Sequence, residues 1–292
     1  MNGPDIIARS VSALKIPDKF NNTWQYHSQS DRHSKITCWS IMFDLLNSCP
    51  LVRQHVAAGK VGFGINLTMR DFQTRRKKDL DLVIAEPAAN ETLKHKRGKL
   101  IKRAILTFAD VAEEYEVKLS WAERKLLDSL PMLPRVPVGN VCVALETKAV
   151  MTAHIKALPR LHDELDSSHS TVHGHSDHSV AAALVVVNVG ESFLSPKLNQ
   201  FDLAKHDPVV NEHQQPKVTL RTIEKVVEIR RRTRPSEQGF DAVGVVLVDF
   251  KNDGSPCRIV TKEPAPQPGD PIHYSAMVQR ICSQYHAKFQ GL

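Results

Sequence analysis

The sequence predicts an α/β protein with a mixed central β-sheet and helices on both of its faces. Two mostly apolar segments, residues 141–150 and 181–188, have the pattern of strands that are buried on both sides within a covered sheet. Residues 60–84 contain two further strand-like segments joined by a short polar turn, which is typical of an antiparallel hairpin. Segments with helical spacing lie before, between and after these strands.

The composition is that of a globular protein with a moderate excess of base. The chain has 292 residues, with 39 Lys and Arg against 32 Asp and Glu, for a formal net charge of +7. Hydrophobic residues at 41% and charged residues at 24% are close to the averages of globular proteins, so wholesale disorder is not expected. The length suits one large domain or one core with an appendage. The positive charge permits a polyanionic partner such as DNA without requiring one.

Targeting and redox signals lead us to expect a cytoplasmic protein with no membrane association. The longest uncharged apolar stretch, residues 179–190, is far shorter than the roughly 20 residues of a membrane helix. The N-terminal residues lack the basic start, apolar centre and cleavage site of a signal peptide. The 5 cysteines are odd in number and form no C-x-x-C pair, which supports neither a disulfide framework nor a cysteine zinc site.

The first elements follow from periodicity and from helix-breaking residues. Residues 1–33 show no sustained period, and we expect an irregular N-terminal segment there. Between Ser34 and Pro50 apolar residues recur at helical spacing, with Ser34 as the N-cap and Pro50 as the stop. Residues 60–69 and 78–84 are the two expected hairpin strands, since apolar and polar residues alternate along the first.

Residues 85–140 are interpreted as an insertion into this core. A basic run opens the insertion, and two helical stretches follow, the second beginning with the capping-box pair Ser120 and Glu123. The apolar strand over 141–150 comes next, and then a helix that Pro159 should end or kink. We expect a polar loop after it, which carries the histidines His162, His169, His173, His175 and His178.

The last hundred residues contain further helices and one more strand. A helix with the apolar residues Ile223 and Val226 precedes an apolar strand over 241–250. The final helix carries apolar residues at helical spacing over 277–289, which is typical of a face in the core or at a dimer interface.

Two of the strands carry charged residues suited to metal-assisted chemistry. Glu146 and Lys148 are two residues apart on one strand, so their side chains share a face. If the strand over 78–84 is a neighbour, Asp81 joins them at the end of the sheet. Two carboxylates with a neighbouring carbonyl, that of Thr147, form a hard oxygen site suited to Mg²⁺, for which Mn²⁺ should substitute. Lys148 beside such a metal can orient or deprotonate the attacking water and offset the developing charge.

Two alternatives stay open for this site. Asp79 lies on the same strand face as Asp81, and spacing does not separate them, although Asp79 follows a basic run with which it can form salt bridges. A rival acid-x-lysine pair, Asp249 and Lys251, stands at the end of the apolar strand over 241–250.

The arrangement resembles the PD-(D/E)xK nuclease superfamily, which includes most type II restriction endonucleases. The matching residues are Asp81 in DLDLVI and the E-x-K of Glu146 and Lys148 in ALETKAV. The resemblance implies a restriction-endonuclease-like core that cleaves DNA with Mg²⁺, in which Asp81 and Glu146 bind the metal and Lys148 is the catalytic lysine. Leu80 stands where the superfamily often has proline. Only Asp44 is available as the first-helix acid that some members use.

The resemblance also suggests an organisation and a role. We expect an N-terminal segment over 1–33, a nuclease core over 34–195 that contains the insertion, and a C-terminal α/β extension over 196–292 for recognition or dimerisation. A type II restriction or phage-defence enzyme is the leading role. The alternatives are a DNA repair or recombination nuclease and an inactive DNA-binding or assembly protein. Double-strand breaks need two sites of opposite polarity, so a homodimer is expected.

Several basic residues outside this site are candidate contacts to DNA. Contacts to phosphates position a protein on DNA without reading its sequence. The candidates lie in the hairpin turn, in the helix after the E-x-K strand and at the end of a later helix, and they are Arg75, Arg76, Lys77, Lys156, Arg160, Arg230, Arg231 and Arg232. The helix dipole favours a basic cluster at a helix C-terminus, and we expect the last three to face DNA.

Overall fold

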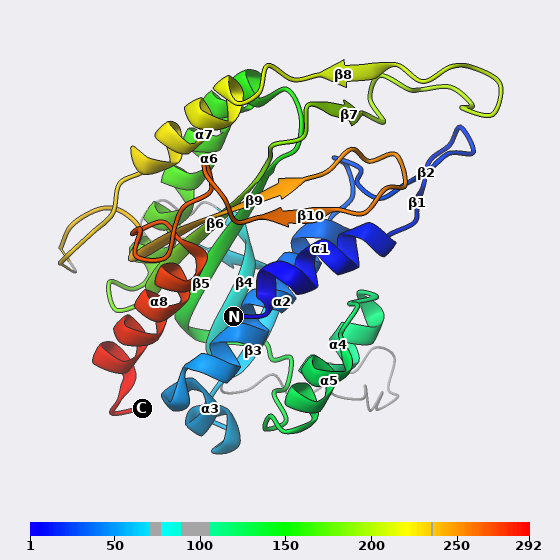
Figure 1. Cartoon of the computed structure of the whole chain (residues 1–292). Helices are drawn as coiled ribbons and strands as arrows, with labels where there is room; N and C mark the ends of the chain where they lie inside the picture. Colours follow the sequence, from blue (N-terminus) through cyan, green and yellow to red (C-terminus); the bar gives the residue numbers. More distant parts are fainter. Residues whose placement is uncertain (71–76, 89–105, 235) are drawn as a thin grey trace.

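A six-stranded mixed sheet forms the centre of the protein in the computed structural model (Figure 1). The structure describes residues 1–70, 77–88, 106–234 and 236–292. In their order across the sheet, the strands are β10 (Arg258–Val260), β9 (Ala242–Asp249), β6 (Val180–Asn188), β5 (Val138–Val150), β4 (Lys77–Pro87) and β3 (Gly62–Arg70). Strands β3, β4 and β5 form an antiparallel meander, β5, β6 and β9 run parallel, and β10 returns antiparallel. The predicted mixed α/β class is confirmed.

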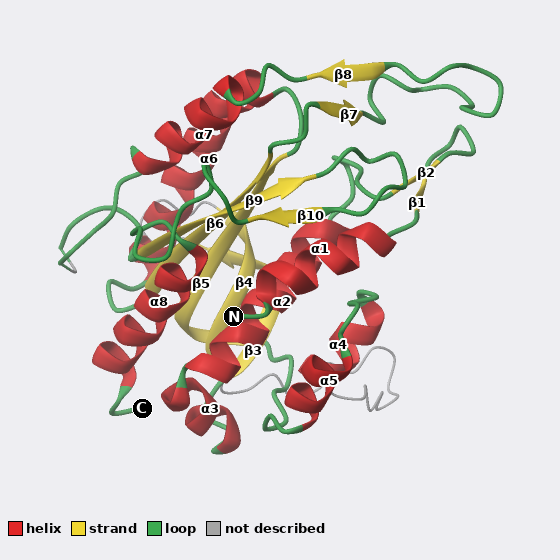
Figure 2. Cartoon of the chain, in the orientation of Figure 1, coloured by secondary structure: helices red, strands yellow, loops and turns green. Residues whose placement is uncertain are grey.

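Helices lie on both faces of this sheet (Figure 2). One side holds α1 (Gly3–Ala13), α2 (Arg32–Ser48), α3 (Pro50–Ala57) and α8 (Tyr274–Phe289), together with α4 (Phe108–Glu114) and α5 (Trp121–Asp128) of the insertion. The other side holds α6 (His154–His175) and α7 (Lys217–Val227). Because β6 is covered on both faces, all of its residues are buried, as its apolar sequence predicted. Among the described helices, none has the length and apolarity of a membrane-spanning segment.

Two small hairpins extend from one end of the sheet. The first pairs β1 (Ile16–Pro17) with β2 (Thr23–Trp24), and the second pairs β7 (Ser192–Leu194) with β8 (Val210–Glu212). The second hairpin follows the carboxyl end of β6, and both project toward the same side of the molecule in Figure 1.

The N-terminal segment is not irregular, because residues 3–13 form the helix α1. Its apolar residues Ile6, Ile7 and Val11 are buried in the core that α2 also helps to form. The carboxylate of Asp44 in α2 accepts hydrogen bonds of 2.8 Å from the backbone N–H groups of Asn2 and Gly3. Asp44 therefore binds the N-terminus of α1 and is not available as a first-helix acid of the catalytic site.

The helix after β5 continues through the proline and the histidine-rich segment. Pro159 lies inside α6, which extends to His175, so the helix does not end at the proline, and the expected polar loop is wrong as far as His175. A proline removes one backbone hydrogen bond. The continued helix compensates for this loss by burying apolar residues against the sheet, among them Leu161, Leu165 and Val172.

The inward face of α6 should make folding sensitive to acid. Burial lowers the pKa of His173 to about 4, and the positive charge of Arg232 adds to the shift. The unfolded chain binds a proton near the ordinary value of 6.5, so the free energy of unfolding should fall as the pH drops from 6.5 toward 4. For His173 alone the loss is on the order of 3 kcal/mol. Urea unfolding at several pH values should show a flatter profile for His173→Asn, and an unchanged profile would contradict this.

The C-terminal part does not form a separate extension of the core. The expected boundary at residue 195 falls inside one sheet, because β9 pairs in parallel with β6. The apolar face of α8 is buried against strands of that sheet and is not available to a partner; its residues are Met277, Val278, Ile281, Tyr285 and Phe289.

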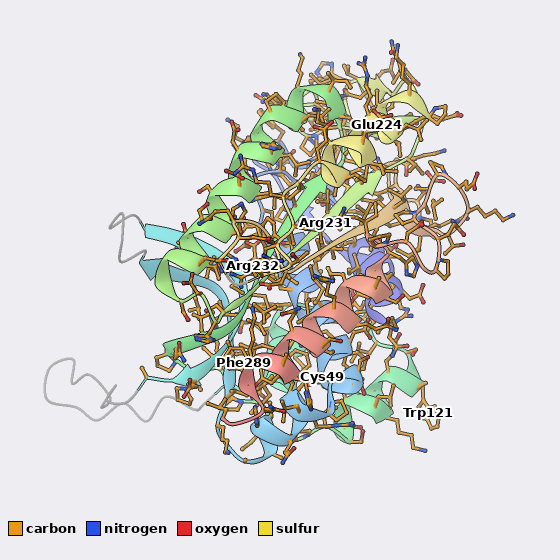
Figure 3. The ribbon with its side chains drawn as sticks, turned by 90° about the vertical axis from the view of Figure 1, so that its left-hand side faces the viewer. Cys49, Trp121, Glu224, Arg231, Arg232 and Phe289 are labelled. Carbon is orange, nitrogen blue, oxygen red and sulfur yellow. The ribbon has the colours of Figure 1, made fainter. Side chains whose placement is uncertain are left out.

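One of the three arginines expected to face DNA is buried. The guanidinium of Arg232 donates to Asp241 at 3.0 and 3.1 Å and to the carbonyl oxygen of Ser179 at 2.8 Å. Figure 3 labels Arg231 and Arg232 in the stretch between α7 and α8. The interior tolerates this charge because a carboxylate and backbone acceptors match its donors. The prediction for Arg232 is therefore wrong, whereas Arg230 and Arg231 are exposed.

Replacing Arg232 with alanine should destabilise the fold. The change leaves the buried Asp241 carboxylate with only part of its compensation, and such losses cost about 3–5 kcal/mol. The exposed Arg231→Ala change removes the same charge and should stay within about 0.5 kcal/mol of the parent. The free energy of unfolding in urea measures both, and equal effects of the two variants would refute the structural role of Arg232.

Candidate active site

The candidate site lies where β4 and β5 separate. Toward the carboxyl end of β5, the last residue pair of the β4–β5 ladder in the described part of the chain is Leu82–Leu145. Beyond that pair, β4 continues along β3, and β5 continues along β6. The carboxylate of Asp81 lies in the resulting gap and accepts hydrogen bonds from the Thr147 backbone N–H at 2.7 Å and hydroxyl at 2.9 Å. Asp81 thus joins the two strands through its side chain at the point where the backbone ladder ends.

The ladder between β3 and β4 is interrupted at the same level. The register of β3 and β4 is the same at Ile65–Leu82 and at Leu67–Leu80, but Asn66 and Asp81 between these pairs are not partners in the ladder. Asn66 has a φ of 53°, a left-handed conformation that asparagine adopts more readily than most residues.

The predicted acid-x-lysine pair is in direct contact. The Lys148 Nζ lies 2.7 Å from Oε1 of Glu146, so the two side chains share one face of β5, as their spacing predicted. The same Nζ lies 2.9 Å from Oε2 of Glu164, which α6 places above the strand. Glu164 also forms an ion pair with Arg160, one helical turn before it.

These contacts determine the charge state of the site. Burial by itself would lower the pKa of Lys148, but the two glutamates raise it above its ordinary value. Burial would raise the pKa of Glu164, yet Arg160 and Lys148 hold it below the usual range. Lys148 is therefore an ammonium ion, better suited to stabilising negative charge and donating hydrogen bonds than to accepting a proton from water.

A pocket of about 460 Å³ opens over this gap. Asp81, Thr147 and Lys148 line it from the strands, and Arg160 and Glu164 line it from α6. Residues from three other segments complete its wall, including Tyr26, His33, Phe193, Ser195 and Lys197. A ligand in this pocket would meet two carboxylates and three cations.

The amino-terminal end of α2 forms another part of the wall. Burial lowers the pKa of His33 to about 4, and the nearby charge of Lys148 also lowers it, so the ring is neutral at physiological pH. The Cys38 Sγ lies 4.0 Å from the hydroxyl of Thr147. Burial raises the pKa of the Cys38 thiol, and the charge of Asp81 raises it further, so a reactive thiolate is not expected.

The donor chemistry of the gap fits a hard cation. Within the described ranges, no group of three or more His, Cys, Asp and Glu side chains is arranged to hold a metal ion. A Mg²⁺ site of the predicted kind needs only one or two carboxylates, because water and substrate phosphate supply the other ligands. Asp81 and Glu146 meet this requirement, since Asp81 binds the peptide N–H that links Glu146 to Thr147. The carbonyl of Thr147 stays a predicted third ligand.

The two alternatives left open by the sequence differ in their positions. Asp79 is exposed and pairs with Thr68 across the β3–β4 ladder, whereas Asp81 lines the pocket. Asp249 ends β9, and the chain then turns into β10 and not into a helix. The pocket and the helix that follows β5 therefore favour Asp81, with Glu146 and Lys148.

The predicted DNA contacts are only partly brought together. Arg160 lines the pocket, and Lys156 is exposed on the same helix. Arg75 and Arg76 lie outside the described residues, and Lys77 begins β4. Arg230 and Arg231 lie near the start of β9, because Arg231 bridges to Phe240, while Lys148 lies toward the carboxyl end of β5. The arginine cluster is therefore at the opposite end of the parallel strands from the pocket.

The fold and this site define an α/β protein with a carboxylate-and-lysine pocket at a break in its sheet. Comparison with protein-family models finds no matching family, and comparisons with curated proteins and with solved structures find no match. The function is therefore inferred from the fold and the pocket alone.

Proposed function

We propose that this protein is a Mg²⁺-dependent endonuclease that hydrolyses phosphodiester bonds in DNA, with Mn²⁺ able to replace Mg²⁺. The observation that carries the proposal is the clustering of Asp81, Glu146 and Lys148 around the gap between β4 and β5, where Asp81 and Lys148 line an open pocket and the buried Glu146 contacts Lys148. Carboxylates for a hard cation and an ammonium for developing negative charge are what phosphodiester hydrolysis requires.

The order of elements around the pocket supports the same proposal. Helix α2, strands β3, β4 and β5, helix α6 and strand β6 follow one another in the order expected for the resembled superfamily. The insertion with α4 and α5 separates β4 from β5 in sequence but leaves the two strands adjacent in the sheet.

The residues of the pocket have distinct roles in this proposal. Asp81 and Glu146 would hold the metal ion, with the Thr147 carbonyl as a further ligand. When bound, the metal polarises a phosphoryl oxygen and lowers the pKa of water. Lys148 donates to the attacking water or to a non-bridging oxygen and stabilises the charge that accumulates on phosphorus. Glu164 keeps Lys148 protonated and aimed into the pocket.

We further propose a role in restriction or phage defence, with DNA repair or recombination as the alternative within the nuclease class. A homodimer would supply the second site that a double-strand break needs. Because the apolar face of α8 is buried within the chain, this dimer would use another surface.

Cleavage assays with several metal ions test the proposed activity. Purified protein should cut plasmid and linear DNA with Mg²⁺ or Mn²⁺, should bind without turnover in Ca²⁺, and should not cut in EDTA. Sequencing the ends of the fragments would give the cleavage position and its symmetry. DNA binding that is equally strong in EDTA, together with no cleavage in any of these ions, would instead identify an inactive DNA-binding protein.

A further inference from the structure

The catalytic pocket continues into a second hollow. A neighbouring cavity of about 560 Å³ is lined by the tip of the first hairpin and by the chain after β7. Ser28, Pro196 and Lys197 line both this cavity and the catalytic pocket. The two hollows therefore form one continuous depression, here called the strand groove, which leads from Lys148 to the tip of the β1–β2 hairpin.

The two hairpins that form the groove are tied together. The side-chain amide of Asn22 donates to the Phe201 carbonyl oxygen at 2.8 Å, and its oxygen accepts from the Leu203 N–H at 3.0 Å. Asn22 comes from the β1–β2 hairpin, whereas Phe201 and Leu203 lie between β7 and β8. In Figure 1 both hairpins project from the same end of the molecule. A buried side chain thus fixes the spacing of the two walls.

The carboxylate at the hairpin end of the groove, Asp18, is engaged within its own hairpin. Asp18 accepts hydrogen bonds from the Trp24 indole N–H at 2.7 Å and from the backbone N–H groups of Phe20 at 2.8 Å and Asn22 at 3.0 Å. Its oxygens point toward these donors, and its negative charge is largely compensated by them.

The lysines of the groove, by contrast, are available to a ligand. Lys19 and Lys197 are exposed, and among the described residues neither takes part in an ion pair. Lys148 and Arg160, deeper in the depression, are both paired with Glu164. His27 and Phe20 also line the groove, and the Nζ of Lys19 lies 5.0 Å from the centre of the Phe20 ring.

We propose that the strand groove binds the sugar–phosphate backbone of DNA on one side of the bond to be cut, with Lys19 and Lys197 as the phosphate contacts. The proposal rests on the proposed function for the position of the cut. Fixed cations along a preformed groove match a polyanion with regularly spaced charges. Because Asn22 links the two hairpins, little conformational entropy should be lost in ordering them when the ligand binds.

Fluorescence anisotropy with a labelled DNA duplex in EDTA tests the groove without requiring cleavage. Loss of two phosphate contacts in a Lys19→Ala/Lys197→Ala variant should reduce the slope of log affinity against log salt by about 1.8. With single-stranded DNA the reduction should be about 1.4. The matched control is Lys217→Ala/Lys262→Ala, which removes two exposed lysines outside the groove and should leave the slope unchanged.

The outcomes separate this proposal from the proposed activity. A groove variant with the slope of the control would overturn the strand groove even if the protein cleaves DNA normally. A reduced slope in a protein that cuts no DNA would support the groove and contradict the hydrolytic function. Circular dichroism and urea unfolding of both double variants should match the parent, since all four lysines are exposed.

Discussion

Replacing Lys148 with alanine should reduce DNA cleavage by at least about 100-fold, because the change removes the only ammonium that contacts both glutamates of the described site. DNA binding should stay nearly intact, since the proposed phosphate contacts Lys19 and Lys197 and the exposed Arg160 are retained. Cleavage rates at saturating Mg²⁺ and anisotropy in Ca²⁺ measure the two effects separately.

Two companion variants make this result interpretable. Lys148→Gln keeps a hydrogen-bond donor between Glu146 and Glu164 and protects the fold if the alanine variant is unstable. It should lose cleavage to a similar extent, because the positive charge is gone. Asp249→Ala, at the rival acid-x-lysine pair, should keep parental activity. Normal cleavage by a folded Lys148 variant would exclude this residue from the reaction.

Removing the charge of Asp81 should be as damaging, but for a different reason. Asp81→Asn keeps the size of the side chain and an oxygen that can accept from Thr147, so the gap between β4 and β5 is preserved. Without the carboxylate, metal binding should weaken and cleavage should fall by at least about 100-fold. Calorimetric titration with Mn²⁺ and cleavage assays would report the two losses independently.

Asp79→Asn is the matched control for this change. The residue is two positions away on β4, and it is exposed outside the pocket. The variant should bind Mn²⁺ and cut DNA as the parent does. If instead Asp79→Asn loses activity and Asp81→Asn keeps it, the assignment of the metal ligand must be reversed.

The central strands and the acid-x-lysine contact could be predicted because their signals are local. A strand covered on both faces needs apolar residues at successive positions, which is the pattern over 181–188. Residues two apart on a strand share a face whatever the rest of the fold does, so the contact of Glu146 with Lys148 followed from spacing.

The features that were missed depend on distant parts of the chain. Glu164 reaches Lys148 only because α6 continues past Pro159, and packing against the sheet stabilises that helix. Its i,i+4 spacing from Arg160 was the available signal. Arg232 belongs to a basic run, and such runs are usually exposed to solvent. In the structure its side chain is buried, because it forms an ion pair with Asp241. His33 carries no sequence signal for its place beside the pocket.

The position of β9 beside β6 in the central sheet also could not be predicted from the local sequence pattern. Its apolar residues identify a buried strand, but not the neighbour beside which it lies. The register between β6 and β9 depends on contacts between residues far apart in the sequence, including the packing of α7 and α8 against the two faces of the sheet.

The position of α8 has a consequence for how the chain is made. This helix covers the face of β5, β6 and β9 with side chains that solvent does not reach, among them Val278, Ile281 and Tyr285. During synthesis on the ribosome, these strands emerge well before the residues that cover them. The nascent chain therefore presents an open apolar face until α8 has left the ribosome, and exposed apolar surface of this kind favours aggregation.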